Sequence, residues 1–256
     1  MTTKQRLDLI ERYIREHKYA DLHTLAERCE TSLSTIRRAL DTLESRGLLR
    51  RHHGGATLVE TDERAREYDF IARDERQAGE KHAIARHIAD LVQPGMTVIL
   101  DGGTSVYAVA RLLVAKRLQV ITNSLPIAAL YADLGSLETI VTGGSIDSRL
   151  GVLVGPLCEQ SLGQIHADLA ILGGAGVTEA GVWNHNALIV ATQRRMIAAA
   201  ERTVFAIDRS KFGRKALALA TPFEPRLSLV TDQAPAPAIA ASVRAAKASL
   251  EIARED

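Results

Sequence analysis

The chain has 256 residues, of which 46% are hydrophobic and 25% are charged, a composition typical of a globular protein with one large domain or a large and a small one. Its formal net charge of +1 excludes a polycation, so an anionic partner must be met by a local surface. No run approaches the roughly 18–20 apolar residues of a membrane span. No secretory signal pattern is present either, and we expect a soluble, cytoplasmic protein.

The first 58 residues are predicted to form a small domain with a wing. The expected elements are helices at residues 4–17, 22–30 and 32–47 and two short strands within residues 48–59. Leu7, Ile10 and Ile14 recur at helical spacing in the first of these segments. Ser32 is expected to cap the third helix, because its hydroxyl can accept a backbone N–H of the first turn. Gly47 stands where a left-handed C-terminal cap would lie.

This pattern is a winged helix-turn-helix, and its charge favours DNA as the partner. Between Leu33 and His53, five arginines stand against two acidic residues. An exposed third helix fits the major groove, and wing residues can reach the flanking backbone or the minor groove. The predicted DNA-binding residues are Ser32, Ser34, Thr35, Arg37, Arg38, Thr42, Arg50, Arg51, His52, His53 and Gly54. Arginine-rich helices also occur as solvated faces, and winged helices also bind proteins.

Residues 59–76 are dense in charge and are predicted to be a linker that becomes helical near Glu75, followed by an α/β domain at residues 77–256. Strands that alternate with helices predict a parallel sheet covered on its faces. The expected strands lie at 97–101, 118–123, 137–144, 168–174, 203–208 and 227–232. The expected helices lie at 84–92, 105–114, 126–134, 187–200 and after the proline-rich segment 233–238, the last with Ile239, Val243, Ala246 and Leu250 facing inward.

The segment Asp101–Ser105, DGGTS, joins a predicted strand to a predicted helix. Glycines permit close backbone approach, and the start of a helix offers N–H donors and a favourable dipole to an anion. The segment is neither a Walker A loop nor a GxGxxG fingerprint, so ATP and NAD are disfavoured and no cofactor is expected. Glycine turns after strands are also common as plain structure.

Other polar residues follow other predicted strands. Because ligands of open parallel sheets bind at the carboxyl ends of strands, these residues predict a pocket for a phosphorylated polyol, with Lys211 as countercharge. The predicted ligand-binding residues are Asp101, Gly102, Gly103, Thr104, Ser105, Thr122, Asn123, Ser124, Gly143, Gly144, Asn184, Asn186 and Lys211. The alternative is ordinary turn chemistry at each strand end.

The segment GVWNHNALIV holds the only tryptophan, Trp183. Asn184 and Asn186 either contact sugar hydroxyls or cap the helix that follows, and His185 is interpreted as a polar group near the surface. No histidine or carboxylate pattern indicates a metal site. Two cysteines, at positions 29 and 158, lack metal-ligand spacing and are interpreted as buried apolar residues in a reducing compartment.

The stretch TIRRALDTLESRGLLRRHHGGA, residues 35–56, resembles the signature of the DeoR family of bacterial transcriptional regulators. LAERCETS at 25–32 matches the preceding turn, although the family usually has Asp in place of Ala39 and Val in place of Thr31. EKHAIA, LDGGTS, TNS, DLAILGGAG and DRSKFG follow in the order of that family's sensor domain, so the resemblance spans about residues 4–233. It implies a sensor fold similar to ribose-5-phosphate isomerase, a phosphorylated sugar effector, and ligand contacts from Asp101, Gly103, Thr104, Ser105, Thr122, Asn123 and Lys211.

The chain departs from the isomerases at the catalytic segment. They carry an acidic D-G-A-D-E stretch, whereas no carboxylate lies between Asp168 and Glu179 here. An enediol mechanism without a positioned base has no proton acceptor. We therefore expect a regulator rather than an enzyme, and a homodimer or homotetramer that binds operator DNA. The resemblance implies repression that the ligand relieves, and activation is the alternative. An isomerase-like enzyme with an appended DNA-binding domain is the alternative.

Overall fold

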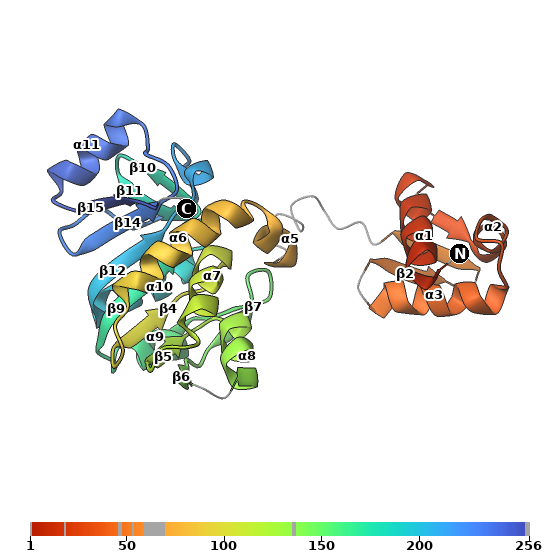
Figure 1. Cartoon of the computed structure of the whole chain (residues 1–256), viewed down its shortest axis with the longest axis horizontal. Coiled ribbons are helices and arrows are strands. Elements are labelled where there is room, and N and C mark those ends of the chain that lie inside the picture. Colours follow the sequence, from red (N-terminus) through yellow and green to blue (C-terminus); the bar gives the residue numbers. More distant parts are fainter. Residues whose placement is uncertain are drawn as a thin grey trace. The chain divides into compact units, whose positions relative to one another are not determined.

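The computed structural model describes residues 2–17, 19–45, 48–52, 54–58, 70–134 and 137–253 (Figure 1). Gly47, His53 and residues 59–69 of the predicted linker lie outside these ranges. The chain divides into two compact units, Met1–Arg64 and Ala65–Asp256. Among the described residues, no helix combines the length and apolarity needed to cross a membrane.

The N-terminal unit packs its helices against a small antiparallel sheet with the strand order β1-β3-β2. Its elements are α1 (Thr3–His17), β1 (Tyr19–Asp21), α2 (Leu22–Arg28), α3 (Leu33–Ser45), β2 (Leu49–His52) and β3 (Gly55–Leu58). The predicted break before α2 contains β1. Asp21 at its end caps α2, since its carboxylate accepts the backbone N–H groups of His23 and Thr24 at 3.0 and 2.9 Å.

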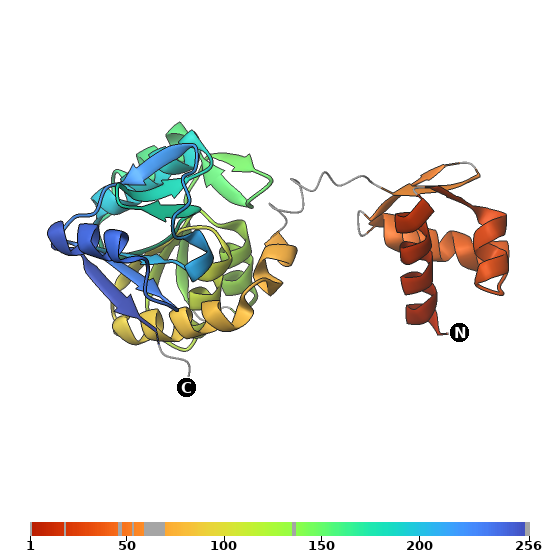
Figure 2. The same cartoon turned by 90° about the horizontal axis from the view of Figure 1, so that it is seen from above.

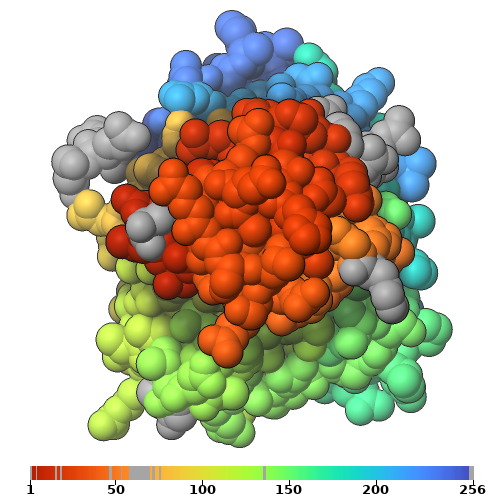
Figure 3. All heavy atoms as spheres, turned by 90° about the vertical axis from the view of Figure 1, so that its right-hand side faces the viewer, coloured from red at the N-terminus to blue at the C-terminus, as the bar shows by residue number. Residues whose placement is uncertain are grey.

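The core of this unit confirms the predicted apolar stripes. Ile10, Ile14, Leu25, Ile36 and Leu40 are fully buried in one cluster. The Ser32 hydroxyl accepts the backbone N–H of Thr35 at 3.3 Å, so the predicted cap of α3 is confirmed. Helices followed by the β2–β3 hairpin make a winged helix-turn-helix, as predicted. Figure 3 shows one face of this unit as spheres, coloured red and orange.

In the described part of the C-terminal unit, seven parallel strands form a sheet with the order β15-β14-β12-β9-β4-β5-β6. Their bounds are β4 (Thr97–Leu100), β5 (Gln119–Thr122), β6 (Glu138–Val141), β9 (Ala167–Gly173), β12 (Ala200–Ala206), β14 (Leu227–Thr231) and β15 (Ser249–Ile252). The predicted parallel α/β fold is therefore confirmed.

Helices cover both faces of this sheet (Figures 1 and 2). One layer consists of α6 (Ala78–Leu91), α7 (Thr104–Leu113) and α8 (Leu125–Leu134), and the other of α9 (Pro156–Leu162), α10 (Ala187–Ala199) and α11 (Pro237–Ala245). Side chains alternate along each strand: Val98 and Leu100 of β4 pack into the core of the first layer, and Ile99 packs into that of the second.

Shorter elements lie around the carboxyl ends of the central strands of the main sheet. They are α5 (Phe70–Glu75), the hairpin β7 (Ser145–Asp147) and β8 (Val152–Val154), the small sheet β10 (Gly176–Thr178), β11 (Gly181–Asn184) and β13 (Ala218–Thr221), and the 3-10 turn η1 (Arg209–Lys211). The chain passes from β4 outward through β5 to β6 and then returns to β9 on the other side of β4. The strand order thus reverses between β4 and β9, which is where open α/β sheets leave a crevice for ligands.

The prediction of a terminal helix that reaches Leu250 is wrong. Helix α11 ends at Ala245, Lys247 adopts a left-handed φ of +57°, and the chain then extends as β15. Leu250 pairs with Leu229 in a parallel ladder. The edge of β14 offers unpaired backbone groups, and satisfying them outweighs the weak helical pattern of this alanine-rich segment.

Candidate functional site

The outer face of α3 presents the polar residues that the sequence predicted. Ser34, Arg37 and Arg38 are exposed, whereas Thr35 and Thr42 are half-buried. Among the described residues, none forms an ion pair with Arg37 or Arg38. The Thr42 hydroxyl donates to the Arg38 carbonyl at 3.0 Å, so this side chain is turned toward its own helix. The two arginines are therefore the α3 residues best placed to reach a groove.

The wing divides its basic residues between two roles. Arg50 is exposed on β2, next to the exposed His52. Arg51 instead forms an ion pair with Asp41 of α3, and its backbone N–H donates to Glu44 at 2.8 Å. Arg51 therefore fastens the wing to the helix. Gly54 is exposed in the turn. Of the predicted DNA-binding residues on the described part of the wing, Arg50, His52 and Gly54 are exposed.

The C-terminal unit contains a cavity of about 520 Å³ at the switch point between β4 and β9. Three adjacent strands have their carboxyl ends at this cavity: the Asp101–Ser105 turn follows β4, Gly173 ends β9 and Gly174 follows it, and Asp208 follows β12. Helix α5 and the β7–β8 hairpin supply further walls. Of the predicted ligand residues, the structure brings these to the cavity: Asp101, Gly102, Gly103, Thr104, Ser105, Asn184 and Lys211.

The Gly102–Gly103 turn requires glycine for two separate reasons. A Cβ at Gly102 would lie 2.1 Å from Cγ1 of Val152 in β8, so the hairpin packs directly on this turn. Gly103 has φ +110°, in the region that favours glycine, and it stands at the N-cap of α7. The first backbone N–H groups of α7 thus open onto the cavity beside Ser105, a geometry that suits an anion.

Three hydrogen-bonded buried side chains, Asp101, Gln193 and Asn184, lie together at the cavity. Asp101 is 3% exposed, and its carboxylate accepts a hydrogen bond from Gln193 Nε2 at 2.7 Å. Gln193 also donates to the Gly173 carbonyl and accepts from Asn184 Nδ2 at 3.4 Å. Burial raises the pKa of Asp101 to about 6, against the hydrogen bond from Gln193, which lowers it. Backbone N–H groups of Gly102 and Gly173 also hydrogen-bond to this carboxylate. A carboxylate offers about four acceptor positions, so one remains for a hydroxyl group of a polyol.

Two lysines, Lys81 and Lys211, also line the cavity. Lys81 is 5% exposed, and its ammonium donates to the Arg73 carbonyl, which ties α6 to α5. Burial lowers the pKa of Lys81, and the carboxylates of Asp74 and Asp208 oppose that effect. Lys211 lies 3.9 Å from the Asp208 carboxylate, with its side chain one-third exposed.

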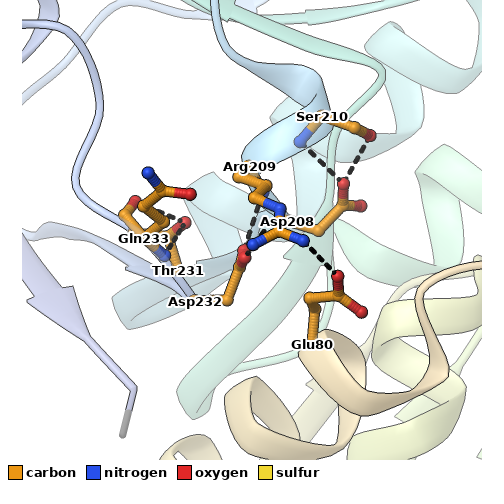
Figure 4. A network of polar contacts seen from close by, with 7 residues as sticks. All are labelled: Glu80, Asp208, Arg209, Ser210, Thr231, Asp232 and Gln233. Atoms are coloured by element: carbon orange, nitrogen blue, oxygen red, sulfur yellow. Dashed lines mark hydrogen bonds and ion pairs between the residues drawn. The ribbon is translucent and has the colours of Figure 1, made fainter.

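A network of polar contacts around Asp208 and Arg209 holds the η1 turn (Figure 4). Asp208 accepts the backbone N–H and the hydroxyl of Ser210, which holds the η1 turn that carries Lys211. Arg209 reaches the other way: its guanidinium donates to Glu80 of α6 at 2.8 Å, and its backbone N–H donates to Asp232 at 2.7 Å. The η1 turn is thereby fastened to the helix that carries Lys81.

Six predicted ligand residues do not line the cavity: Thr122, Asn123, Ser124, Gly143, Gly144 and Asn186. The physical reason is that β5 and β6 lie on the far side of β4, and the β7–β8 hairpin covers the end of β5. Asn123 donates to the Leu153 carbonyl of that hairpin at 3.0 Å, and the Thr122 hydroxyl donates to the Leu100 carbonyl. Asn123 thus fastens the hairpin that walls the cavity, whereas Thr122 ties the end of β5 to the end of β4.

The two asparagines lie in different places in the structure. The Asn186 side chain caps α10 by accepting the backbone N–H of Leu188, and it also donates to Asp147 of the hairpin at 3.0 Å. Asn184 lines the cavity instead, with its amide already bonded to Gln193. His185 lines the cavity as well.

Sequence reasoning missed several cavity residues, namely Arg73, Arg76, Gln77, Lys81, Gly173, Gly174, Ala175, Arg214 and Lys215. Arg73 and Arg76 fall in the predicted linker, because the high charge density and few apolar residues of 59–76 indicate a linker rather than part of a binding site. The clustered cations of residues 211–215 were a usable signal, since Lys211 itself was recognised. Among the described residues, no group of three or more His, Cys, Asp or Glu side chains could hold a metal ion.

Comparison with known families agrees with the two-part organisation. Residues 6–62 match the DeoR-like helix-turn-helix domain, and residues 76–233 match the DeoR C terminal sensor domain. The chain is similar to the L-fucose operon activator of Haemophilus influenzae, with 31% identity over 82% of this chain and 84% of that protein. It is also similar to the glycerol-3-phosphate regulon repressor of Escherichia coli K12, with 32% identity over 85% of this chain and 86% of that protein.

Among solved structures, ribose 5-phosphate isomerase A from Methanocaldococcus jannaschii matches 52% of this chain and 53% of its own chain, with a TM-score of 0.38 and 18% identity. A likeness at this score carries no argument about function. The relatives with higher identity are named as transcriptional regulators and not as enzymes, so the prediction of a regulator is confirmed and the isomerase alternative has no support. The chain belongs to the DeoR family of DNA-binding transcriptional regulators.

Proposed function

We propose that this regulator represses genes of carbohydrate metabolism and that a phosphorylated sugar or sugar-acid metabolite, bound in the cavity of the C-terminal unit, controls its binding to operator DNA. Residues 1–58 bind DNA, residues 59–76 link the two parts and contribute Arg73 and Arg76 to the cavity, and residues 77–256 sense the effector. The protein acts in the cytoplasm as a homodimer or homotetramer, because one winged helix makes few base contacts and paired half-sites add specificity.

One observation carries the proposal: the cavity places an anion site and a polyol site side by side. The Gly102–Gly103 turn and the start of α7 offer backbone N–H groups, and Lys81 and Lys211 offer positive charge. The buried carboxylate of Asp101 supplies the acceptor for hydroxyl groups. The names of the two relatives refer to L-fucose and glycerol 3-phosphate, both polyhydroxyl compounds, which supports an effector of this class.

The DNA side of the proposal rests on exposed charge. Arg37 and Arg38 on α3 and Arg50 on the wing project without an ion-pair partner among the described residues. Arginine can read guanine bidentately in the major groove and can neutralise phosphates beside it. For the effector to control DNA binding, it must bind more tightly to one arrangement of the two DNA-binding domains of an oligomer than to another. Repression relieved by the ligand is the direction that we propose.

The test combines two measurements on the full chain. The operator is first selected from genomic fragments, and its affinity is measured by fluorescence anisotropy. Thermal unfolding is then followed against a panel of sugars, sugar phosphates and phosphorylated sugar acids. A ligand at 100 times its dissociation constant adds about 2.7 kcal/mol, which raises the melting temperature of a domain of this size by roughly 5–10 °C.

We expect a shift from a phosphorylated compound that is absent with its unphosphorylated parent, and we expect the same compound to weaken operator binding. Lys211→Gln removes both effects. Arg117→Gln is the matched control, because Arg117 is exposed and does not line the cavity. A compound that tightens operator binding would reverse the proposed direction, and a panel with no shift at all would overturn the sugar-phosphate proposal.

A further inference from the structure

The cavity carries more positive charge than one phosphate group balances. Of the described residues that line it, six are cationic and two are carboxylates, which leaves a formal excess of four positive charges. The cations are Arg73, Arg76, Lys81, Lys211, Arg214 and Lys215. A phosphomonoester carries about −1.5 to −2 near neutral pH. A single phosphate therefore leaves about two positive charges without an anionic partner inside the cavity.

The cations form two groups that are held by different elements. The first group belongs to the region of α5, where a Cβ placed on Gly103 would lie 3.8 Å from the Arg73 guanidinium. Arg73 therefore stands next to the glycine turn at the start of α7. An anion on that turn would meet both the helix N-terminus and an arginine.

The second group follows η1 and comprises Lys211, Arg214 and Lys215. The backbone carbonyl of Arg214 packs against Gly176 of β10, where a Cβ would lie 2.1 Å from it. The Lys215 ammonium stands 5.8 Å from the centre of the Trp183 ring on β11. This group is thus anchored to the small sheet rather than to α5.

Lys81 lies between the two groups. Its electrostatic neighbours include Arg73 from the first group and Lys211 from the second, together with the carboxylates of Asp74 and Asp208. Lys211 has the nearby carboxylate of Asp208, but in the described part of the chain neither Arg214 nor Lys215 forms an ion pair. Three cations within five residues repel one another, and an anion between them relieves that repulsion.

We infer that the effector carries two anionic groups, a phosphate on the glycine turn beside Arg73 and a second phosphate or carboxylate held by Lys211, Arg214 and Lys215. The effector is then a sugar bisphosphate or a phosphorylated sugar acid rather than a simple sugar monophosphate. Between the two ends, the Asp101 carboxylate meets the hydroxyl groups of the carbon chain. This inference rests on the proposed function and narrows its ligand.

The experiment pairs ligands that differ by one anionic group and proteins that differ at the second group of cations. The ligand pairs are fructose 6-phosphate with fructose 1,6-bisphosphate, and glucose 6-phosphate with 6-phosphogluconate. The proteins are the wild type, the double variant Arg214→Gln/Lys215→Gln, and the control Arg117→Gln. Arg214 and Lys215 are exposed, so their neutralisation leaves the fold intact. Dissociation constants are measured by calorimetry at one fixed ionic strength.

In the wild type and in the control, the ligand with the second anionic group binds at least about tenfold more tightly than its partner, the size expected of a charge-assisted hydrogen bond. In the double variant this advantage disappears, whereas the affinity for the monophosphates changes less than about twofold. The bisphosphate pair and the sugar-acid pair distinguish a second phosphate from a carboxylate.

A second measurement does not depend on the identity of the sugar. Crystals soaked in inorganic phosphate are expected to hold one ion at the glycine turn and one at residues 211–215 in the wild type, and only the first in the double variant. Equal affinity for both members of each pair, or an equal loss for both in the double variant, would overturn the inference and leave the proposed function standing. If no phosphorylated compound bound and neither ion were present, both would fall.

Discussion

The DNA-binding head and the ligand cavity present positive charge in two different ways. Arg37, Arg38 and Arg50 project from a short helix and a wing, and they are exposed. Lys81 is 5% exposed and is tied to a backbone carbonyl, and Lys211 stands on a turn whose Asp208 side chain is 2% exposed. The first arrangement can adapt to an extended polyanion, whereas the second fixes the place of a small one.

This difference has an electrostatic consequence. Salt screens exposed charges over about 8–10 Å and screens buried pairs much less. Binding through the head therefore depends steeply on ionic strength, because DNA releases its condensed counterions. Binding in the cavity depends less on salt and more on how precisely its charged side chains are positioned. The hydrogen bonds of Arg209 and Asp208 hold the turn that carries Lys211 (Figure 4).

The largest effect is expected from a negative charge placed at the glycine turn. Ser105→Asp puts a carboxylate where the phosphate is proposed to bind, and it should weaken effector binding more than a hundredfold, with operator binding unchanged. An acidic residue in the first turn of a helix is favourable for the fold. Calorimetry measures the loss, and Ser105→Ala serves as the control without charge. A variant that still released DNA on addition of effector would show that the turn is not the phosphate site.

The next effect concerns the buried carboxylate of the cavity. Burial raises the pKa of Asp101 from 3.8 to about 6. The folded state therefore binds a proton more tightly than the unfolded state, so this group makes the free energy of unfolding fall as pH rises from about 4 to 6 and then level off. The total loss is about 3 kcal/mol by linkage.

Asp101→Asn should remove this pH dependence. In urea unfolding of the protein without ligand, the stability of the variant relative to wild type should rise between pH 4 and 6 and stay constant above that range. The exposed Asp133→Asn is the matched control. A difference between variant and wild type that did not change with pH would contradict this account of Asp101.

In the head, the expected losses are smaller because each arginine acts alone. Arg37→Ala and Arg38→Ala should each weaken specific operator binding by about 1–3 kcal/mol if the side chain reads a base. Effector binding should not change, since the cavity lies in the other unit. Fluorescence anisotropy on the selected operator gives the loss, and the exposed Arg117→Ala in the C-terminal unit serves as the control. Unchanged affinity would exclude base reading by that residue.

Asn186 supports a wall of the cavity without lining it, so its substitution should change stability but not effector affinity. Asn186→Ala removes the cap of α10 and should lower the free energy of unfolding by about 1 kcal/mol. Asn186→Ser keeps a capping oxygen and should recover most of the loss. Because Asn186 does not line the cavity, the affinity of the folded variant for effector should stay within about twofold. A large selective loss of affinity would instead assign Asn186 to the ligand.

The smallest effect tests the electrostatic difference itself. Arg50→Gln should reduce the slope of log affinity against log salt by about 1 for operator DNA if Arg50 contacts a phosphate. The same change should leave the affinity for effector untouched at every salt concentration. A slope equal to that of the wild type would remove Arg50 from the contact with the DNA backbone.

Much of this organisation followed from local sequence. The apolar stripe of α3, its Ser32 cap and the alternation of strands and helices depend on neighbours within a few turns, so periodicity reveals them. The Asp101–Ser105 turn was recognisable for the same reason, because it combines a strand end, two glycines and a helix start in consecutive residues. Periodicity was misleading near Leu250: the spacing of Ile239, Val243, Ala246 and Leu250 is helical, but pairing with the distant strand β14 makes the segment around Leu250 a strand.

The order of the strands was not recognisable, because it is fixed by contacts between residues far apart in the chain. Sequence alone determined that polar residues end β4, β5, β6 and β12, but the tertiary structure decided that the ends of β4, β9 and β12 share a cavity while the end of β5 lies under the hairpin. It also brought Arg73 from the predicted linker to Gly103, about thirty residues later. Long-range burial and backbone pairing make these choices, and local residue patterns carry no information about them.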